Sequence, residues 1–423
     1  MTTAGRVKLL EDRAAGHNSR GSQMRKACVV VPLLALWLCA GCAPKAKRTY
    51  LLGVVGPFTG DGAQFGEMIR MGAEMKADEI NRAGGIGGVP LELEFQDDKG
   101  DPKEAANVAQ KLGSNPRVLA VIGHFNSSCS LAGKEVYKAM QVLQLTPGST
   151  NVTVCAGSDW TFRNVYRDDY QGQFIADYIY YVLGYRRVAV FFDNDDYGRG
   201  LHDAFAARAR EIGLNVVGEE AYVRDTQEYT PQLTKLMAQK PDIIFISGLY
   251  ANAAQILTQA RNLGMKTPFI GGDGLLSSDL ITNAGGAAEG TLVTCPFLPT
   301  GSDAATKKFV ASFKERYNGT EPDCWAALTY DALGIIAQAI AKAGPDRKAI
   351  RDYVAALDAP AKAYPGVAGA TYFNRDGDCM KPLVVAAVRG GKFLPYEKQA
   401  DALDAAKKSA PATTAAPPTT VKK

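Results

Sequence analysis

Short apolar strands alternate with amphipathic helices along most of this chain, and this alternation constrains the fold more than any other feature. The first series of predicted strands covers residues 50–55, 91–95 and 118–123, and the second covers 188–192, 242–247 and 268–272. Apolar strands separated by helices are typical of parallel sheets that are covered on both faces. Two successive series therefore predict an α/β protein with two doubly wound lobes.

The length agrees with this division, because 423 residues are too many for one compact core. Ligands of doubly wound sheets bind beyond the carboxyl ends of the strands. We therefore expect the functional residues in the short loops that follow the strands. From residue 399 the chain is rich in Ala, Pro, Thr and Lys without apolar periodicity, which predicts a disordered tail over 399–423.

The N-terminal part carries an export signal. Residues 24–41 have two cations, an apolar run and then small residues, which is the form of a secretory signal peptide. The ending Cys39-Ala40-Gly41-Cys42 resembles a bacterial lipobox, which implies lipidation of Cys42, although Cys39 stands where Leu is usual. The alternative is an ordinary signal peptide cut near Ala40. Residues 1–23 have no apolar run and are interpreted as an upstream extension. The apolar run itself is too short to span a bilayer permanently, and no other stretch is predicted to do so.

Charge and metal-ligating residues exclude several classes of partner. The chain has 48 basic and 44 acidic residues, but six of the basic and two of the acidic residues lie in residues 1–42, so the remainder is neutral. A net basic surface for nucleic acid is therefore missing. After residue 42 the only histidines are His124 and His202, and no cysteines have CxxC spacing. We expect no metal and no cofactor.

Several segments, in order, resemble the branched-chain amino acid (Leu/Ile/Val) substrate-binding proteins of ABC transporters, which have the type I periplasmic binding protein fold. They are GVVGPFTGDGAQFG, QDDKGDPKEAANVAQKL, VIGHFNSSCS, LTPGST, FFDNDDYGRG, SGLYANAAQIL and FIGGDGL. The similarity covers residues 48–395. It implies two lobes joined by a three-segment hinge, with lobe 1 at 48–164 plus 295–368 and lobe 2 at 165–294 plus 369–398.

The resemblance implies a site for the ligand carboxylate in lobe 1. Ser128 occupies the family position whose hydroxyl donates to the carboxylate, at a helix start where free backbone N–H groups favour an anion. Either Ser127 or Ser128 could instead serve only as a helix cap. In LTPGST the amides of Ser149 and Thr150 are expected to bind the same carboxylate, and the Thr150 hydroxyl and Ser149 carbonyl to accept from the ligand ammonium.

Lobe 2 is expected to supply the ammonium site and much of the wall. Asp273 occupies the acidic position of the family and would pair with the ammonium, although an Asp between glycines is commonly a turn residue. Tyr197 and Tyr250 follow strands and would wall the pocket, unless they are ordinary core residues. Phe65 stands where the family often has Tyr, which makes the side-chain end of the pocket more apolar.

These residues predict an exported solute-binding lipoprotein, located in the periplasm or at the cell surface. It would bind a branched-chain or other apolar amino acid and deliver it to ABC permease subunits, as a monomer anchored to the membrane by lipid. The alternative is a binder or sensor of another small ligand, such as an amide, urea or an aromatic acid. An enzyme is not expected, because Ser128, His124 and Asp98 occur without a GxSxG elbow.

The cysteines leave their pairing open. Five follow Cys42, and an odd number leaves at least one thiol free. The disulfide frequent in the family is absent, because its positions hold Gly100 and Asn126. Two pairings are hypotheses: a disulfide between Cys129 and Cys155, and one between Cys324 and Cys379.

Overall fold

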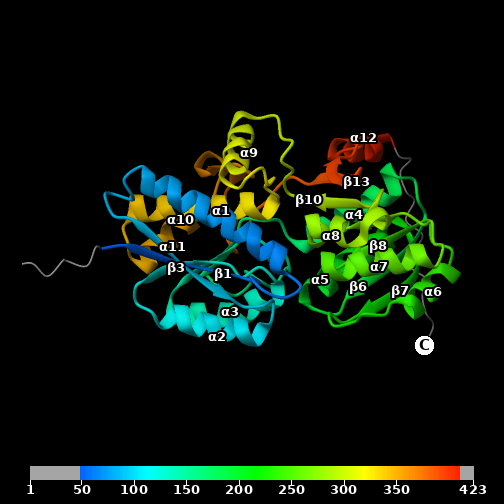
Figure 1. The fold of residues 1–423 in the computed structure, drawn as a ribbon, viewed down its shortest axis with the longest axis horizontal. Coiled ribbons are helices and arrows are strands. Elements are labelled where there is room, and N and C mark those ends of the chain that lie inside the picture. Colours follow the sequence, from blue (N-terminus) through cyan, green and yellow to red (C-terminus); the bar gives the residue numbers. More distant parts are fainter. Residues whose placement is uncertain (1–47, 410–423) are drawn as a thin grey trace, which may run out of the picture. The chain divides into compact units, whose positions relative to one another are not determined.

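The structure is a computed structural model that describes residues 48–409. The predicted signal segment, Cys42 and residues 410–423 lie outside the described residues. Figure 1 shows the elements along the chain. Each strand predicted from the sequence is present, with ends that differ by one or two residues, which is the usual uncertainty of such boundaries.

The first sheet has five parallel strands in the order β2-β1-β3-β4-β5. Helices α1, α2, α3, α10 and α11 pack around it, and together they form lobe 1 (Figure 1). The central strand β3 is buried along its whole length, as an all-apolar VLAVI segment between two helical layers should be. The elements are β1 (Tyr50–Gly56), β2 (Leu91–Asp97), β3 (Val118–Ile122), β4 (Leu143–Thr146), β5 (Thr161–Arg163), α1 (Ala63–Arg82), α2 (Pro102–Ser114), α3 (Ser127–Met140), α10 (Cys324–Ala343) and α11 (Arg347–Ala355).

The second sheet has seven strands in the order β14-β13-β10-β9-β8-β6-β7. Strands β6 to β10 run parallel, whereas β13 and β14 are antiparallel additions at one edge. With helices α4 to α8 this sheet forms lobe 2. The elements are β6 (Arg187–Asp193), β7 (Asn215–Tyr222), β8 (Ile243–Ser247), β9 (Phe269–Gly271), β10 (Leu292–Cys295), β13 (Val384–Arg389), β14 (Lys392–Pro395), α4 (Asp168–Asp177), η1 (Tyr178–Val182), α5 (Asp196–Ile212), α6 (Thr230–Ala238), α7 (Tyr250–Asn262), η2 (Asp273–Leu275), α8 (Ser278–Ala284) and η3 (Gly285–Ala288).

The chain crosses between the lobes three times: between β5 and α4, after β10, and before β13. After the second crossing the chain returns to lobe 1. It forms α9 (Ala304–Arg316), α10, α11, η4 (Pro360–Lys362) and the hairpin of β11 (Tyr364–Gly366) and β12 (Gly369–Thr371). Asp378, on the third crossing, lies 2.8 Å from Arg163 Nε and 3.0 Å from Arg167 Nη1, both on the first crossing. Arg163 is fully buried, so this ion pair joins two hinge segments inside the protein. The predicted fold, two lobes with a three-segment hinge, is confirmed.

Helix α10 has the length and apolarity of a membrane-spanning helix. Among the described residues it is the one helix long and apolar enough, by length and composition, to cross a membrane. However, 89% of its apolar window is buried inside the protein, against elements that include α1 and α11. Its apolarity is therefore that of a core helix.

The predicted disordered tail is wrong for its first part. Residues Ala400–Ser409 form helix α12, which Figure 1 shows in red. Leu403 is buried, and Lys407 Nζ lies 2.5 Å from Asp177 Oδ2 in lobe 2. The segment ADALDAAKKS consists largely of good helix formers, and a single buried leucine is enough to attach it to the lobe. Composition alone does not separate these residues from the Pro-rich segment that follows them, so the predicted tail included both.

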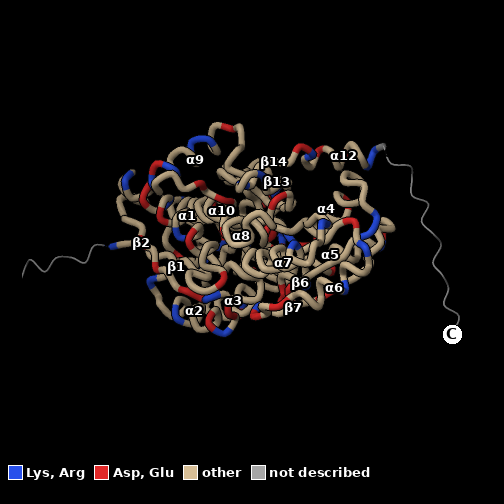
Figure 2. Tube along the Cα trace, turned by 45° about the vertical axis from the view of Figure 1, so that its right-hand side comes forward, with Lys and Arg blue, Asp and Glu red and all other residues tan. Residues whose placement is uncertain are grey.

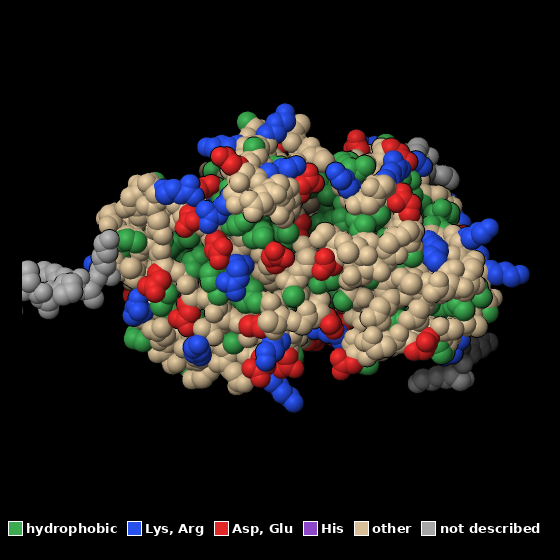
Figure 3. Space-filling model, viewed as in Figure 1, with side chains coloured by type: hydrophobic (Ala, Val, Ile, Leu, Met, Phe, Trp, Pro, Cys, Tyr) green, Lys and Arg blue, Asp and Glu red, His purple; other side chains and the backbone are tan. Residues whose placement is uncertain are grey.

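Acidic and basic residues are interspersed over the backbone of both lobes in Figure 2, and Figure 3 shows the same mixture on one face of the surface. This distribution fits the neutral charge balance of the chain beyond residue 42.

Candidate functional site

A small pocket lies between the two lobes, at the carboxyl ends of their strands. Its volume is about 10 Å³, which is room for about one water molecule. Lobe 1 contributes Phe125, Asn126, Ser127, Gly148 and Trp325, and lobe 2 contributes Tyr197, Leu249, Asp273 and Gly274. Of the residues predicted from the sequence, Tyr197 and Asp273 line this pocket directly.

Asp273 is held in place on one side only. Its Oδ1 accepts a hydrogen bond from the Tyr197 hydroxyl at 2.9 Å, and that hydroxyl accepts from the Gly274 amide at 3.1 Å. Its Oδ2 is buried without a hydrogen-bond donor among the described residues. Burial raises the pKa of Asp273 to about 6, against the hydrogen bond from Tyr197. The free oxygen is therefore an acceptor prepared for a cationic group.

Asp168 is a second buried carboxylate that the sequence did not single out. It begins α4, is fully buried, and neither of its oxygens has a donor within the described chain. Burial raises the pKa of Asp168 well above its usual value, and repulsion from Asp273 adds to this shift. Its backbone N–H donates to the Thr150 carbonyl at 2.9 Å. The Thr150 hydroxyl is also buried without a partner among these residues. This end of the site thus holds several carboxylate oxygens, and the Thr150 hydroxyl lies close enough to Asp168 to lower the pKa of that carboxyl.

The opposite, donor-rich side is the start of α3. No side chain caps this helix, so its first amides are available to an anion. Ser127 is buried and lines the pocket, and its hydroxyl accepts from the Asn151 amide at 3.2 Å, which leaves its own hydrogen free to donate. Ser128 lines the larger cavity at the mouth of the cleft instead. Ser127 therefore lines the small pocket and Ser128 does not, because successive residues of a helix start point in different directions, and the carboxylate contact of Ser128 stays a prediction.

Ser149 has a structural role in the turn after β4. Its amide donates to Thr146 Oγ1 at 3.0 Å, its hydroxyl donates to the Phe125 carbonyl at 2.8 Å, and its carbonyl accepts from Arg163 at 3.0 Å. The single amide hydrogen of Ser149 is thus already used. The contact of this amide with a ligand carboxylate stays a prediction; in this structure the amide donates to Thr146, and Gly148, one residue earlier, lines the pocket.

Four aromatic rings close the remaining side of the site. Phe65 stacks on Phe125 at 4.5 Å between ring centroids and meets Tyr250 edge-on at 4.8 Å. Trp325 packs edge-on against Phe125 at 4.9 Å. Trp325 also donates through Nε1 to the Leu276 carbonyl of lobe 2 at 3.3 Å. Phe65 and Tyr250 are thus near the pocket as predicted, but behind its first layer, whereas Phe125 and Trp325 were missed.

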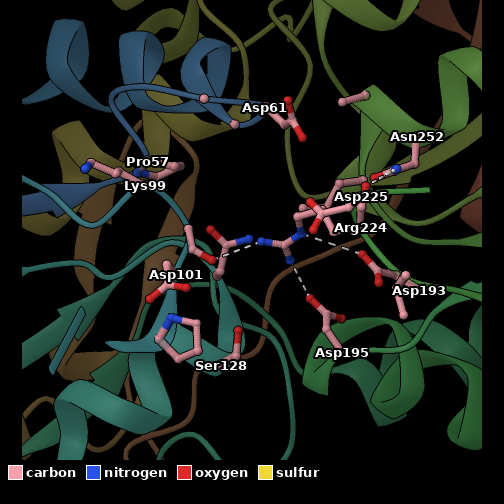
Figure 4. Close-up of a pocket in the computed structure, with 18 of the residues that line it drawn as sticks. Pro57, Asp61, Lys99, Asp101, Ser128, Asp193, Asp195, Arg224, Asp225 and Asn252 are labelled. Atoms are coloured by element: carbon pink, nitrogen blue, oxygen red, sulfur yellow. Dashed lines mark hydrogen bonds and ion pairs between the residues drawn. The ribbon is translucent and has the colours of Figure 1, made fainter. Parts of the chain in front are cut away.

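A larger cavity of about 610 Å³ adjoins the small pocket, and both share Asn126 and Leu249. Figure 4 shows Arg224 extending across its centre, with Asp193 and Asp195 on the lobe 2 side. Burial raises the pKa of Asp193 to about 7, and the Asp195 carboxylate adds to the shift. This cavity is the mouth of the cleft.

The five described cysteines are buried and free, so both disulfide hypotheses are wrong. Cys155 Sγ donates to the Gly377 carbonyl at 3.7 Å, whereas Cys129 lies on α3 near Asp98. Cys379 Sγ donates to the Met380 carbonyl at 3.4 Å, whereas Cys324 begins α10 beside Asp323 and Cys295. The members of each predicted pair therefore have different surroundings.

Within residues 48–409 no group of three or more His, Cys, Asp or Glu side chains could hold a metal ion. His124 is instead fully buried, and its Nδ1 lies 2.7 Å from Asp98 Oδ2. The pair fixes the loop that leads into α3.

Comparison with known proteins agrees with this arrangement. A family model described as "Periplasmic binding protein" matches residues 49–392. An "Amino acid binding protein" of Pseudomonas aeruginosa is 36% identical over 317 residues, which are 74% of this chain and 83% of that protein.

Solved structures show the same fold. The leucine binding protein LivK of Thermotoga maritima superposes with a TM-score of 0.77 at 33% identity, covering 82% of this chain and 98% of that one. The substrate binding protein LivJ of Streptococcus pneumoniae, in complex with isoleucine, has a TM-score of 0.77 at 29% identity, with the same coverages of 82% and 98%. A solute binding protein of R. palustris in complex with benzoate shares the fold at 18% identity, a TM-score of 0.76 and coverages of 84% and 96%. The chain therefore belongs to the periplasmic binding protein family, with the two-lobed type I fold of the ABC-transporter proteins that bind amino acids, and is a solute-binding protein and not an enzyme.

Proposed function

We propose that this protein captures an α-amino acid with an apolar side chain between its two lobes and delivers it to an ABC permease. The observation that carries the proposal is the polarity of the pocket: the unpaired Asp273 Oδ2 of lobe 2 lines it together with Ser127, at the uncapped start of α3 in lobe 1. Asp168 is a second buried carboxylate near Asp273. An α-amino acid presents an ammonium and a carboxylate on neighbouring atoms, so it supplies one group to each side.

The ammonium would bind to Asp273 Oδ2 and be further stabilised by Asp168 and the Thr150 hydroxyl. The carboxylate would accept from the Ser127 hydroxyl and from the first amides of α3. Charge-assisted hydrogen bonds of this kind contribute about 1.5–3 kcal/mol each. A few of them, with apolar burial, are sufficient for micromolar binding, which corresponds to about −8 kcal/mol.

The side chain of the ligand would lie against Phe65, Phe125, Tyr250 and Trp325. These rings offer apolar surface, which favours a branched-chain or other apolar amino acid. Because the pocket measures about 10 Å³ in this closed arrangement, the lobes must move apart before an amino acid can enter. Contacts from both lobes would then favour reclosure around the ligand.

Calorimetry of refolded, ligand-stripped protein with the twenty common amino acids, benzoate, urea and acetamide tests this function. We expect saturable binding of one or more apolar amino acids. Binding of benzoate or an amide without any amino acid would replace the proposal by the alternative of another small ligand. That alternative has support from the fold alone, since the benzoate-binding neighbour is only 18% identical.

We also propose that the protein is exported, lipidated at Cys42 and monomeric. The signal-like residues 24–41 and the small residues before Cys42 support this proposal. Detergent phase partitioning of the expressed full-length chain should place it in the detergent phase, and the Cys42→Ser variant in the aqueous phase. Equal partitioning of the two would contradict lipidation. Light scattering should give the mass of one chain.

A further inference from the structure

A long side chain of lobe 2 crosses the mouth of the cleft, where the Asn151 side-chain amide of lobe 1 also donates to the Asp196 carbonyl of lobe 2 at 2.5 Å. Arg224 follows β7 in lobe 2, and its Nη1 donates to the Gly100 carbonyl in lobe 1 at 3.0 Å. Its Nη2 donates to Asp195 Oδ2 at 2.6 Å, and its Nε lies 3.8 Å from Asp193 Oδ2. Figure 4 shows the guanidinium between these partners, with the carboxylates on its own lobe and the carbonyl on the other.

The acceptor of this bond is held firmly. Gly100 has φ +67°, a conformation that glycine adopts without strain, and its amide donates to Asp98 Oδ1 at 2.9 Å. A Cβ at this position would lie 3.2 Å from Arg224 Nη1, so the absence of a side chain permits the close approach.

The same buried carboxylate connects this loop to the ligand pocket. Asp98 Oδ2 contacts His124 Nδ1 at 2.7 Å, and His124 leads directly into the pocket residues Phe125, Asn126 and Ser127. The His124 carbonyl accepts from Thr146 Oγ1 at 2.6 Å, which ties the loop to the turn that carries Gly148. The Gly100 carbonyl and the pocket residues that follow His124 therefore share one buried support, the Asp98 carboxylate.

We propose that Arg224 is a latch that holds the closed form and sets the residence time of the ligand. Among the contacts of Arg224, only the bond to Gly100 joins the two lobes. When the lobes separate, the guanidinium keeps Asp195 and Asp193 as partners, so opening leaves no buried cation unpaired. The bond can therefore break and re-form with each cycle, and its loss should act on the dissociation rate more than on the association rate.

Arg199 provides a matched control. It lines the same cavity and carries the same charge, but it is exposed and its Nε donates to Asn194 Oδ1 at 2.6 Å, within lobe 2. Arg199→Ala removes a cation from the mouth without removing a bond between lobes. Arg224→Lys keeps a cation that can still donate to a carbonyl, but it cannot pair bidentately.

The test has two arms. The effect of the latch on ligand dissociation rests on the proposed function, whereas its effect on closure of the ligand-free protein does not. In the first arm, small-angle X-ray scattering of the ligand-free protein should show a larger radius of gyration for Arg224→Ala than for wild type, Arg199→Ala and Arg224→Lys. This arm needs no ligand, so it stays informative if the protein binds no amino acid.

In the second arm, stopped-flow dissociation of L-leucine, or of L-isoleucine if leucine does not bind, should be about tenfold faster for Arg224→Ala and nearly unchanged for Arg199→Ala. The association rate should change less than threefold. Thermal unfolding and circular dichroism of each variant establish that it is folded, and Arg224→Met, which keeps an apolar stem but has no donor, replaces Arg224→Ala if the latter is not. Equal radii and equal dissociation rates for the Arg224 and Arg199 variants would overturn the proposal.

Discussion

The Tyr197 hydroxyl donates to Asp273 Oδ1 at 2.9 Å, while the other oxygen of the same buried carboxylate has no donor among the described residues. One oxygen thus orients the group and the other remains for a ligand. We expect Asp273→Asn to weaken binding of an α-amino acid by at least about tenfold, since a charge-assisted hydrogen bond is lost. The unfolding temperature of the ligand-free protein should change little, because the substitution also removes a buried charge.

The ligand itself offers a control for this prediction. Leucine and its α-hydroxy analogue differ only in the ammonium, so wild type should prefer leucine strongly and Asp273→Asn should lose most of that preference. Calorimetry measures both affinities. An unchanged preference in the variant would show that the ammonium binds elsewhere.

Asp168 and its neighbour form a natural pair for mutation. Asp168 is fully buried near Asp273, whereas Asp169 is partly exposed and pairs with Arg167 at 2.8 Å. We expect Asp168→Asn to reduce amino acid affinity by about tenfold and Asp169→Asn to leave it within about twofold, since surface ion pairs contribute little. Equal effects of the two substitutions would contradict a role of Asp168 in neutralising the ammonium.

The two serines at the start of α3 should differ in the same way. Ser127→Ala removes a hydroxyl that lines the pocket, and we expect about a tenfold loss of affinity. Ser128→Ala changes only the wall of the mouth cavity and should have an effect of less than about threefold. Titration calorimetry of both variants against the same amino acid decides the assignment, and the reverse order would assign the contact to Ser128.

Binding and stability should respond to pH in opposite directions. Burial raises the pKa of Asp273 to about 6, so the folded protein holds this proton more tightly than the unfolded chain does. The contribution of Asp273 to the free energy of unfolding should therefore increase as pH falls from about 6 toward 4, and disappear as pH rises through 6. The ammonium needs the ionised carboxylate, so affinity should fall about fivefold between pH 6 and pH 5, as the ionised fraction drops from about one half to about one tenth.

Thermal unfolding and calorimetry across this range measure the two trends. The Asp273→Asn variant has no carboxyl at this position, so its free energy of unfolding should lack the pH dependence that Asp273 causes. The difference between the wild-type and variant pH profiles measures the contribution of Asp273. A wild-type affinity independent of pH from 7 to 5 would contradict the assignment.

The free cysteines give a separate prediction. Alkylation of the unfolded chain without reductant should label Cys129, Cys155, Cys295, Cys324 and Cys379, and labelling of the native protein should be slow because all five are buried. Peptide mass spectrometry reads each site. A pair that reacts only after reduction would show that a disulfide forms.

The sequence predicts the sheets well and the individual contacts less well, for physical reasons. Strands such as Val118–Ile122 are buried on both faces, so their apolar runs are unambiguous. The choice between Ser127 and Ser128 depends on the direction of two successive side chains at a helix start, which motif similarity does not specify.

Asp168 and Trp325 were missed because of their places in the chain. Asp168 stands at the start of a helix, where an acidic residue is expected because it interacts favourably with the helix dipole. Only its burial indicates a role beyond that interaction. Trp325 reaches the pocket from α10, after the second crossing between the lobes, far from the other pocket residues in sequence. The burial pattern of a hinge region is a tertiary property that a single sequence does not reveal.

The ion pairs of Asp378 with Arg163 and Arg167 have a consequence for how the two halves can move. They fasten the first and third connections to each other, so these strands must bend in concert and cannot slide past one another. We expect such a joint to favour bending of the hinge over twisting. The rims of the two halves then return to the same alignment each time they meet, which is what recognition by a membrane partner would require of them.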